Sequence, residues 1–399
     1  MSAAPDAPAR RYGGPVSRQV KGLPSSSPGT VAVLTALITE GAQSRADLAR
    51  STGLTSAAVT KVVNPLTTAG YLREVGPTGT GGLGRPASRV EVVGDAAFVV
   101  GLKVTGSEVL GVLVDLSGHV RGVASQELET HEVEHVLDVI VEVTEKLCAD
   151  PEHASRLRHV GIGISGGVDD TGLVSYSHFL GWHGVRLAPL VHGRLGLPVA
   201  VDNDVRALTA GERWFGAGVG RTSFAVVTVG AGIGCALSYQ GQLLAGVHGV
   251  SGELGHLPVA GDRPCHCGGH GCLDTVATTP SLLRDVEAVT GAPVATLEDA
   301  VALAADDERV AEVFRDAGHA LGRGIASVVN LFGPQSVVLT GEGLVALDVI
   351  RESMRAGYVE QAYGQAIHAE LIVRPLPFEA WAHGAATLAL QAFLHGGER

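Results

Sequence analysis

The strongest constraint on the fold is a strand-turn-strand pattern that occurs twice in the chain. The first copy begins near Ala97 and continues F-V-V-G-L-K-V-T-G-S-E-V-L-G-V-L-V-D-L-S-G. The second copy begins at Phe224 and reads F-A-V-V-T-V-G-A-G-I-G-C-A-L-S-Y-Q-G. Helical patterns follow each copy, such as residues 133–148 and 307–328, so the sequence predicts an α/β body made of two related halves. A fold of this kind brings ligand groups together in the cleft where its halves face each other.

The charge of the chain is divided unevenly between its two ends. The chain has 399 residues and a formal net charge of −12, and this length predicts two or three domains. Residues 1–90 carry a net charge of +6, and the remainder carries −18. This asymmetry favours a small basic head that faces nucleic acid, attached to a large acidic body. A solvated charged tail is the alternative interpretation.

The basic head has the pattern of a helix-turn-helix. Residues 1–28 are rich in Ala, Pro, Ser and Gly and are predicted to form a disordered tail, which could also follow DNA phosphates. The expected helices run from Thr30 to near Gly41, from the N-cap Ser44 to Gly53, and onward from the N-cap Thr55. Pro65 lies inside the third helix and could kink it. Two short helices joined by a Gly-containing turn place the second of them in the major groove of DNA.

A Gly-rich hairpin completes a predicted winged head over residues 29–93. Strands expected at 71–75 and 89–93 flank T-G-T-G-G-L-G-R-P, whose Arg85 is placed to reach the minor groove or a phosphate. The alternative for Arg85 is a surface turn residue. The predicted DNA contacts are Ser44, Thr55, Ser56, Thr60, Lys61 and Arg85. On the opposite face of the third helix, apolar side chains are expected to enter the core, namely Val59, Val62, Val63 and Leu66.

A cluster of cysteine and histidine residues indicates a metal site. The run G-E-L-G-H at 252–256 precedes C-H-C-G-G-H-G-C at 265–272. Together they supply one imidazole and three thiolates, a complete tetrahedral set for a structural zinc ion that leaves no position for water. The predicted ligands are His256, Cys265, Cys267 and Cys272. Three reduced cysteines without a metal are the alternative, and His266 or His270 could compete for the ion.

The same cysteines bear on the compartment. Their close, uneven spacing does not match a secreted disulfide framework, so a reducing compartment is expected. The N-terminus has no apolar signal-peptide core, and the longest uncharged stretch, residues 222–252, is interrupted by glycines and other polar residues. We therefore predict a cytoplasmic protein with no membrane partner.

A polar pair follows a predicted strand at the edge where α/β folds bind ligands. In V-D-N-D at 201–204, Asn203 can both donate and accept, and Asp204 can accept from a hydroxyl or act as a general base. This pair suits a hydroxyl-rich ligand. Taken alone, N-D is more often a turn, and Glu253 is more often a solvated carboxylate.

Taken together, these motifs over residues 29–399 resemble the ROK family of repressors, unassigned reading frames and kinases. The marks are N-D at 203–204, G-E-L-G-H, and C-H-C-G-G-H-G-C-L-D, where Asp274 replaces the family's glutamate. The resemblance implies an actin-like, ribonuclease H-like sugar-kinase fold over 94–399, whose halves divide near residue 205 and whose C-terminal helix returns to the first half. It also implies the zinc site and a sugar held by Asn203, Asp204, Glu253, His256 and Asp274.

Two turns of the kind that bind phosphate in a kinase help to distinguish a sugar sensor from a sugar kinase. Kinases of this family bind ATP through a D-x-G-G-T turn, and here the matching turn is K-V-T-G-S, with Lys103 in place of the aspartate. Phosphoryl transfer depends on charge neutralisation at this place, so neither ATP with Mg²⁺ nor enzyme activity is expected. The second turn has Ala231 in place of threonine, and V-V-L-T-G-E-G contains Glu342.

We therefore predict a repressor, a homodimer or dimer of dimers, that binds a palindromic operator and responds to a sugar or sugar phosphate. One alternative is a glucokinase-like sugar kinase with a fused DNA-binding head. Another is a ligand-independent repressor whose body only dimerises.

Overall fold

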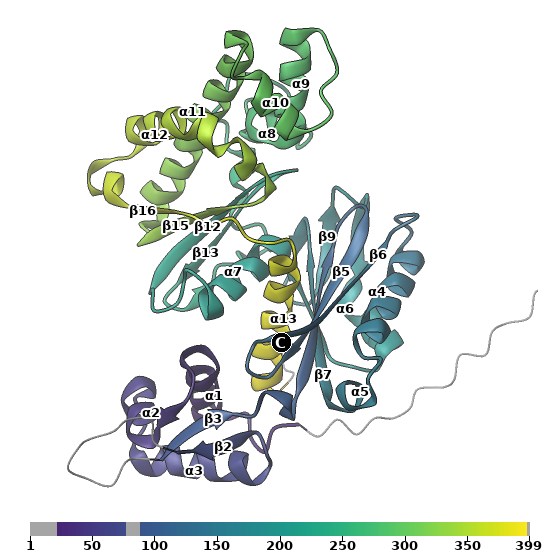
Figure 1. Ribbon diagram of the computed structural model, residues 1–399, viewed down its shortest axis with the longest axis vertical. Coiled ribbons are helices and arrows are strands. Elements are labelled where there is room, and N and C mark those ends of the chain that lie inside the picture. The colour runs from purple at the N-terminus through teal and green to yellow at the C-terminus, as the bar shows by residue number, and fades with distance from the viewer. Residues whose placement is uncertain (1–21, 77–87, 397–399) are drawn as a thin grey trace, which may run out of the picture.

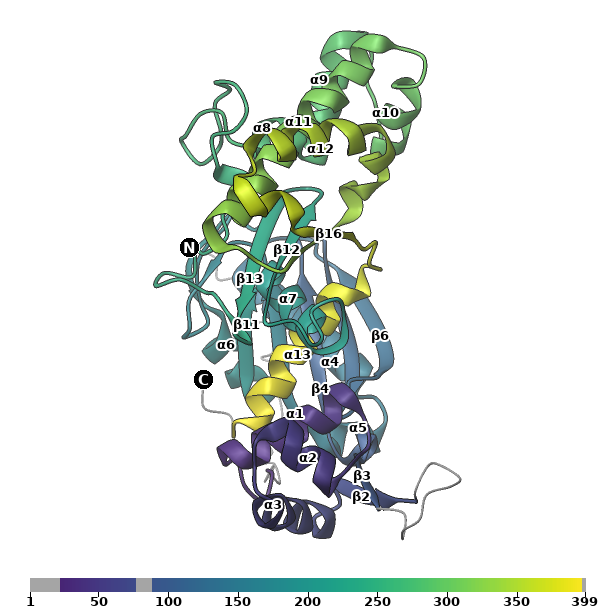
Figure 2. The same ribbon diagram turned by 90° about the vertical axis from the view of Figure 1, so that its left-hand side faces the viewer.

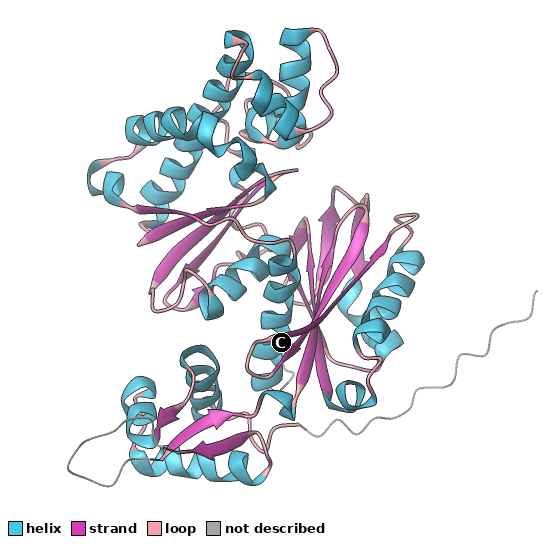
Figure 3. Cartoon of the chain, in the orientation of Figure 1, coloured by secondary structure: helices cyan, strands magenta, loops and turns pink. Residues whose placement is uncertain are grey.

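The computed structural model describes residues 22–76 and 88–396. In chain order these residues form a small head and the two halves of a larger body (Figure 1). Each half of the body is an α/β layer in which helices pack on the faces of a sheet (Figure 3). No helix in the described ranges is long and apolar enough to cross a bilayer.

The head consists of helices and a three-stranded sheet in the order β1-β3-β2. Each helix begins at a side-chain cap, because Ser27, Ser44 and Thr55 each accept the backbone N–H three residues further on. The predicted caps Ser44 and Thr55 are therefore confirmed. The elements are α1 (Pro28–Glu40), β1 (Gln43–Ser44), α2 (Arg45–Thr52), α3 (Ser56–Thr68), β2 (Leu72–Val75) and β3 (Arg89–Val92).

Two features of the head bear on the predictions. Gly53, with a φ of 69°, turns the chain between α2 and α3 in the left-handed region that glycine adopts without strain. α3 contains Pro65 and continues to Thr68. The predicted wing tip with Arg85, and residues 1–21 of the predicted tail, lie outside the described residues.

The first half of the body is built on a sheet in the order β11-β7-β4-β5-β6. β4, β5 and β6 are antiparallel, while β7 and β11 extend the sheet in parallel from β4. Every residue of β4 and β7 is buried, as expected for strands covered by helices on both faces. The strands are β4 (Phe98–Val104), β5 (Glu108–Asp115), β6 (Val120–Glu127), β7 (Leu157–Ile164) and β11 (Val199–Asn203); a smaller sheet holds β8 (Gly167–Val168), β9 (Leu173–Ser177) and β10 (Trp182–Arg186). The helices are α4 (Val133–Leu147), α5 (Pro151–Arg156) and α6 (Leu187–Leu195).

The second half repeats this topology in the order β14-β13-β12-β15-β16. β12 and β13 form an antiparallel hairpin, and β15 and β16 extend it in parallel from β12. The duplication expected from the sequence is thus present in the sheets. The elements are β12 (Ser223–Val229), β13 (Ile233–Tyr239), β14 (Gln242–Leu243), α8 (Asp274–Ala277), α9 (Thr279–Thr290), α10 (Leu297–Leu303), α11 (Glu308–Phe332), β15 (Ser336–Thr340), α12 (Leu347–Gln361) and β16 (Glu370–Val373).

The last helix, α13 (Glu379–Leu394), packs against the sheet of the first half and against α7 (Asp204–Phe215). The contact is very close. A Cβ atom added at Gly161 of β7 would lie 1.9 Å from the carbonyl oxygen of Ala385, and one at Gly101 of β4 would lie 2.1 Å from that of Ala382. Only glycine allows the backbone of α13 to approach the strands this closely.

The head shares a hydrophobic cluster with the C-terminal end of α13. Val33, Leu34 and Leu37 of α1 belong to the same buried cluster as Leu390 and Phe393. Figure 2 shows α13 in yellow running from the level of β16 down to α1. The head and the body are therefore joined through this helix as well as through the chain.

His159 of β7 lies at this junction, with its ring centroid 5.8 Å from that of Phe393. It is 6% exposed, and neither ring nitrogen has a hydrogen-bond partner among the described residues. Burial lowers the pKa of His159 to about 4. The unfolded chain binds a proton at a histidine near pH 6.5, whereas the folded chain does so only near pH 4. Because the unfolded state binds the proton first, stability falls as the pH drops between these values.

We expect this one group to lower the free energy of unfolding by about 3 kcal/mol between pH 6.5 and pH 4. Urea unfolding across this range should show a smaller acid loss in a His159→Leu variant than in the wild type. His183→Gln, at an exposed histidine, is the control and should follow the wild type. Equal acid losses for His159→Leu and the wild type would contradict the assignment.

Candidate functional site

The predicted polar pair lies where β11 ends and α7 begins. Asn203 is the N-cap of α7: its Oδ1 accepts from the backbone N–H of Val205 at 2.9 Å and of Arg206 at 3.2 Å, and its Nδ2 donates to the carbonyl of Gly166 at 3.0 Å. Asp204 follows as the first residue of the helix, and its Oδ1 accepts from the N–H of Val205 at 2.9 Å. A helix N-terminus favours negative charge, so the fold holds Asp204 where a carboxylate is stable.

Lys103 of β4 forms a buried ion pair with Asp204. Its Nζ donates to Oδ2 of Asp204, and the two side chains are 9% and 10% exposed. The ammonium also lies over the ring of Trp381 in α13, 4.7 Å from the ring centroid. The pair joins two segments that the sequence analysis treated separately, the turn at Lys103 and the polar pair at 203–204. This pairing was not predicted from the sequence.

Arg206 joins the segments around the site and was also missed by sequence reasoning. Its side chain is buried, and its guanidinium donates to Asp202, to the carbonyl of Val168 at 2.5 Å and to that of Gly249 at 2.7 Å. Val168 belongs to the first half and Gly249 to the second. One buried cation therefore connects β8 of the first half and a loop of the second half to the start of α7.

Glu253, His256 and Asp274 lie in the second half. Oε1 of Glu253 accepts the hydroxyl of Tyr176, from β9 of the first half, at 2.9 Å. Burial, together with the Glu253 carboxylate, raises the pKa of Tyr176 to about 12, so the tyrosine remains a donor. Oδ1 of Asp274 accepts the N–H of Ile233 at 3.1 Å, and burial raises the pKa of Asp274. A contact of Glu253 or Asp274 with Asn203 or Asp204 is not among the hydrogen bonds of the described residues.

The predicted metal ligands converge. One ligand atom each from His256, Cys265, Cys267 and Cys272 lies within 4.8 Å of all the others. The Nδ1 of His256 is 3.6 Å from the Sγ of Cys265, and the Sγ atoms of Cys267 and Cys272 are also 3.6 Å apart. Ligands about 2.3 Å from a tetrahedral ion lie about 3.8 Å from each other. The four residues thus fit one tetrahedral metal ion.

The metal loop contains two further histidines, His266 and His270, which the sequence offers as competing ligands. His270 is exposed. His266 is also exposed, but its ring stacks on His178 of the first half, with 4.5 Å between ring centroids. The metal loop therefore contacts the first half directly, a contact that the sequence did not indicate.

The two phosphate-type turns are closed by the chain itself. Between β12 and β13, the backbone N–H of Ala231 donates to Oε1 of Glu342 at 2.8 Å, and a Cβ added at Gly230 would lie 2.0 Å from the same oxygen. In the first half, Oγ1 of Thr105 accepts the N–H groups of Ser107 and Glu108. Side chains therefore accept backbone N–H groups at both turns.

On the head, four of the predicted DNA contacts lie on one exposed face. Thr55, Ser56, Thr60 and Lys61 are exposed, at the start and on the outer side of α3. Val59, Val63 and Leu66 are buried, and Val62 is partly buried, as the sequence predicted. Ser44 is 8% exposed, and its hydroxyl is the cap of α2.

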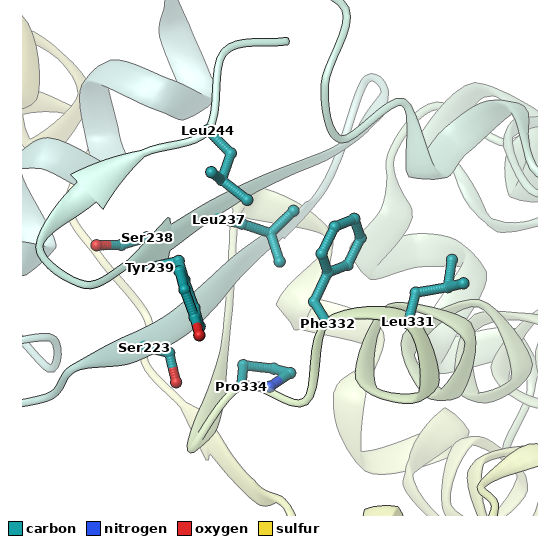
Figure 4. Close-up of a pocket in the computed structure, with 8 residues that line it drawn as sticks. All are labelled: Ser223, Leu237, Ser238, Tyr239, Leu244, Leu331, Phe332 and Pro334. Carbon is teal, nitrogen blue, oxygen red and sulfur yellow. The ribbon is translucent and has the colours of Figure 1, made fainter.

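An apolar pocket of about 250 Å³ lies away from these groups (Figure 4). It is lined by Ser223 at the start of β12, by Ser238 and Tyr239 at the end of β13, by Phe332 at the end of α11 and by Pro334 after it. The turn at Ala231 is at the other end of the same two strands. The pocket and the turn at Ala231 are therefore at opposite ends of the hairpin.

Comparisons with known proteins agree with this architecture. A family model described as ROK family matches residues 99–392. The chain is 27% identical to the xylose repressor of Bacillus subtilis, over 88% of this chain and 92% of the repressor. It is 32% identical to the glucokinase of Thermotoga maritima, over 63% of this chain and 84% of the kinase. A solved ROK family transcriptional regulator, described as a homologue of the Escherichia coli MLC protein, superposes with a TM-score of 0.79 at 26% identity, over 93% of this chain and 97% of that one.

Proposed function

Because the chain belongs to the ROK family, we propose that it is a DNA-binding transcriptional repressor whose affinity for its operator is set by a sugar bound in the body. One observation carries the proposal. α13 shares a buried cluster with α1 of the head and also packs against α7, which begins at Asp204. A ligand that binds beside Asp204 could therefore affect the head through the packing of α7 on α13 and of α13 on α1.

The head supplies the DNA contacts in this proposal. The exposed start of α3, with Thr55, Ser56, Thr60 and Lys61, enters the major groove, and Arg85 of the wing contacts the minor groove or a phosphate. Ser44 contributes through the cap that fixes the start of α2. A palindromic operator requires two heads, so we propose a homodimer or a dimer of dimers. We propose that the protein acts in the cytoplasm.

The body supplies the sugar contacts. Carboxylates accept from the hydroxyls of a sugar or sugar phosphate, and an amide both accepts from and donates to them. The proposed contacts are Asn203, Asp204, Glu253, His256 and Asp274. Asp274 is one methylene shorter than the family's glutamate, so its carboxylate reaches less far. The bond from Tyr176 to Glu253 and the two-sided contacts of Arg206 support a site that both halves form.

We propose that the tetrahedral ligand set holds a structural zinc ion. His256, Cys265, Cys267 and Cys272 fill all four positions, so the ion would hold the loop and the adjoining Asp274 rather than activate water. Metal binding requires deprotonated thiols. Zinc binding should therefore release protons and weaken as the pH falls.

Elemental analysis of the purified chain tests the zinc site. We expect about one equivalent of zinc per chain and less than half an equivalent in a Cys267→Ser variant, with a lower thermal midpoint. Cys148→Ser, at the end of α4 and away from the cluster, is the control and should keep the wild-type zinc content. Less than half an equivalent in the wild type would contradict the site.

A sugar kinase is the second candidate, because a glucokinase is among the relatives. Two observations disfavour it. Asp204 is paired with Lys103, and Glu342 already accepts the N–H of Ala231 in the second phosphate turn. A carboxylate at that position repels a phosphate. We expect no sugar phosphate when the zinc-loaded chain is incubated with Mg²⁺, ATP and a panel of hexoses, and measurable product would overturn the repressor-only role.

Operator binding tests the main proposal. The operator is selected from a random DNA library, and affinity is then measured by fluorescence anisotropy with and without each sugar of a panel. We expect one sugar to raise the thermal midpoint of the chain and to change operator affinity by about tenfold. Lys61→Ala should weaken operator binding by about 1–3 kcal/mol and leave the thermal midpoint unchanged.

Arg351→Ala provides the matched control, because Arg351 is an exposed cation on α12 of the body; it should bind the operator like the wild type. If the chain binds an operator and no sugar changes either the midpoint or the affinity, the body only dimerises. If no operator is selected, the DNA-binding role fails.

A further inference from the structure

We propose that Lys103 and Trp381 are positioning residues that couple the cleft to the head: Lys103 holds Asp204 in the sugar-free chain, and a sugar hydroxyl that binds Asp204 moves Lys103 and with it Trp381. This inference rests on the proposed function, since it needs a sugar at Asp204. It assigns the switch to a pair of side chains that take no part in DNA binding.

The ion pair leaves Asp204 little freedom to bind another group. Its Oδ1 is bonded to the backbone of Val205, and its Oδ2 faces the ammonium of Lys103. Both side chains are at least nine-tenths buried, so neither can turn to water. A sugar hydroxyl that donates to Oδ2 must therefore displace the ammonium of Lys103 or share Oδ2 with it. The sugar-free and sugar-bound chains then differ at Lys103, which a two-state switch requires.

Trp381 provides the second position for the displaced charge. The ammonium already lies 4.7 Å from the centroid of its ring, where the ring face attracts a cation. A movement of Lys103 away from Asp204 thus keeps the charge against a favourable partner. The same movement of the Lys103 ammonium changes its contact with Trp381, which lies in the N-terminal turn of α13.

Trp381 is also a contact between the two halves. It packs against the cluster formed by Leu208 of α7, Phe224 and Val226 of β12, and Val338 of β15. Lys103, in contrast, belongs to β4 of the first half. A change in the Lys103–Trp381 contact therefore acts where the first half, the second half and α13 meet.

α13 extends from this meeting point to the head. The helix has 16 residues and is about 24 Å long, and its other end shares a cluster with α1. Close backbone contacts at Gly101, Gly161 and Gly384 keep the helix from repacking locally. A displacement at Trp381 is thus transmitted along a rigid element.

The test uses the full-length, zinc-loaded chain with the sugar and the operator that the operator-binding experiment selects. Two quantities are measured for each variant, the Kd for the sugar and the ratio of operator affinities without and with saturating sugar. In Lys103→Met no pair has to be broken, so we expect the sugar Kd to fall about fivefold and the ratio to approach one. In Trp381→Leu the ion pair remains, so we expect a sugar Kd within about twofold of the wild type and again a ratio near one.

Conservative variants separate this role from a general loss of packing. Lys103→Arg keeps the charge and Trp381→Phe keeps an aromatic face, so both should retain most of the wild-type ratio. Trp381→Phe should also lose the sugar-dependent change in tryptophan fluorescence, while Trp182 and Trp214 remain as internal reference fluorophores. This fluorescence readout holds even if Lys103→Met does not fold.

The outcomes are distinguishable. A wild-type chain that binds no sugar overturns the proposed function and this inference together. A wild-type chain that responds to sugar, with Lys103→Met and Trp381→Leu variants that keep the wild-type ratio, overturns the coupling role alone. Loss of the ratio in both variants, with rescue by the conservative ones, supports it.

Discussion

The close contact of α13 with two strands of the first half is the constraint on which the other contacts depend. Gly101 and Gly161 let the carbonyl groups of Ala382 and Ala385 approach the sheet to distances that no side chain would permit. Gly384 allows the same approach to α7, where an added Cβ would lie 2.4 Å from the carbonyl oxygen of Ala207. These contacts place Trp381 over Lys103 at one end of the helix and Phe393 against the head at the other.

The parts of the fold that depend on local rules could be predicted from the sequence. Ser44 and Thr55 were identified as caps because a hydroxyl before a helix satisfies an N–H three residues later, whatever the rest of the fold does. The convergence of His256 with three cysteines was predicted because one imidazole and three thiolates within a short segment are typical of a structural zinc site. The duplication was visible because a strand-turn-strand pattern is itself local, although the order of the strands in each sheet is not.

The contacts that define the site join residues far apart in the chain, and no local pattern indicates them. Lys103 and Asp204 are 101 residues apart, and Ala231 and Glu342 are 111 apart. The sequence analysis noted Lys103 in place of the family's aspartate and Glu342 in a turn, but it predicted a partner for neither. It could not show that Lys103 pairs with Asp204, because the pairing depends on how β4 lies beside the start of α7. Arg206 was missed for the same reason, since its two carbonyl partners come from different halves.

Lys103 and Glu342 together affect which ligand could bring the two halves of the body together. In a kinase, a metal ion and phosphates bring positive and negative charge into the cleft with the nucleotide. Here a lysine beside Asp204 and a glutamate on the N–H of Ala231 are already part of the chain. If the chain acts as the proposed sensor, these groups leave a nucleotide little to gain by binding. In the proposed function, the free energy that moves the halves comes from the sugar, because a ligand shifts an equilibrium only by its different affinity for the two states. A repressor of the proposed kind would report the concentration of a sugar independently of the concentration of ATP.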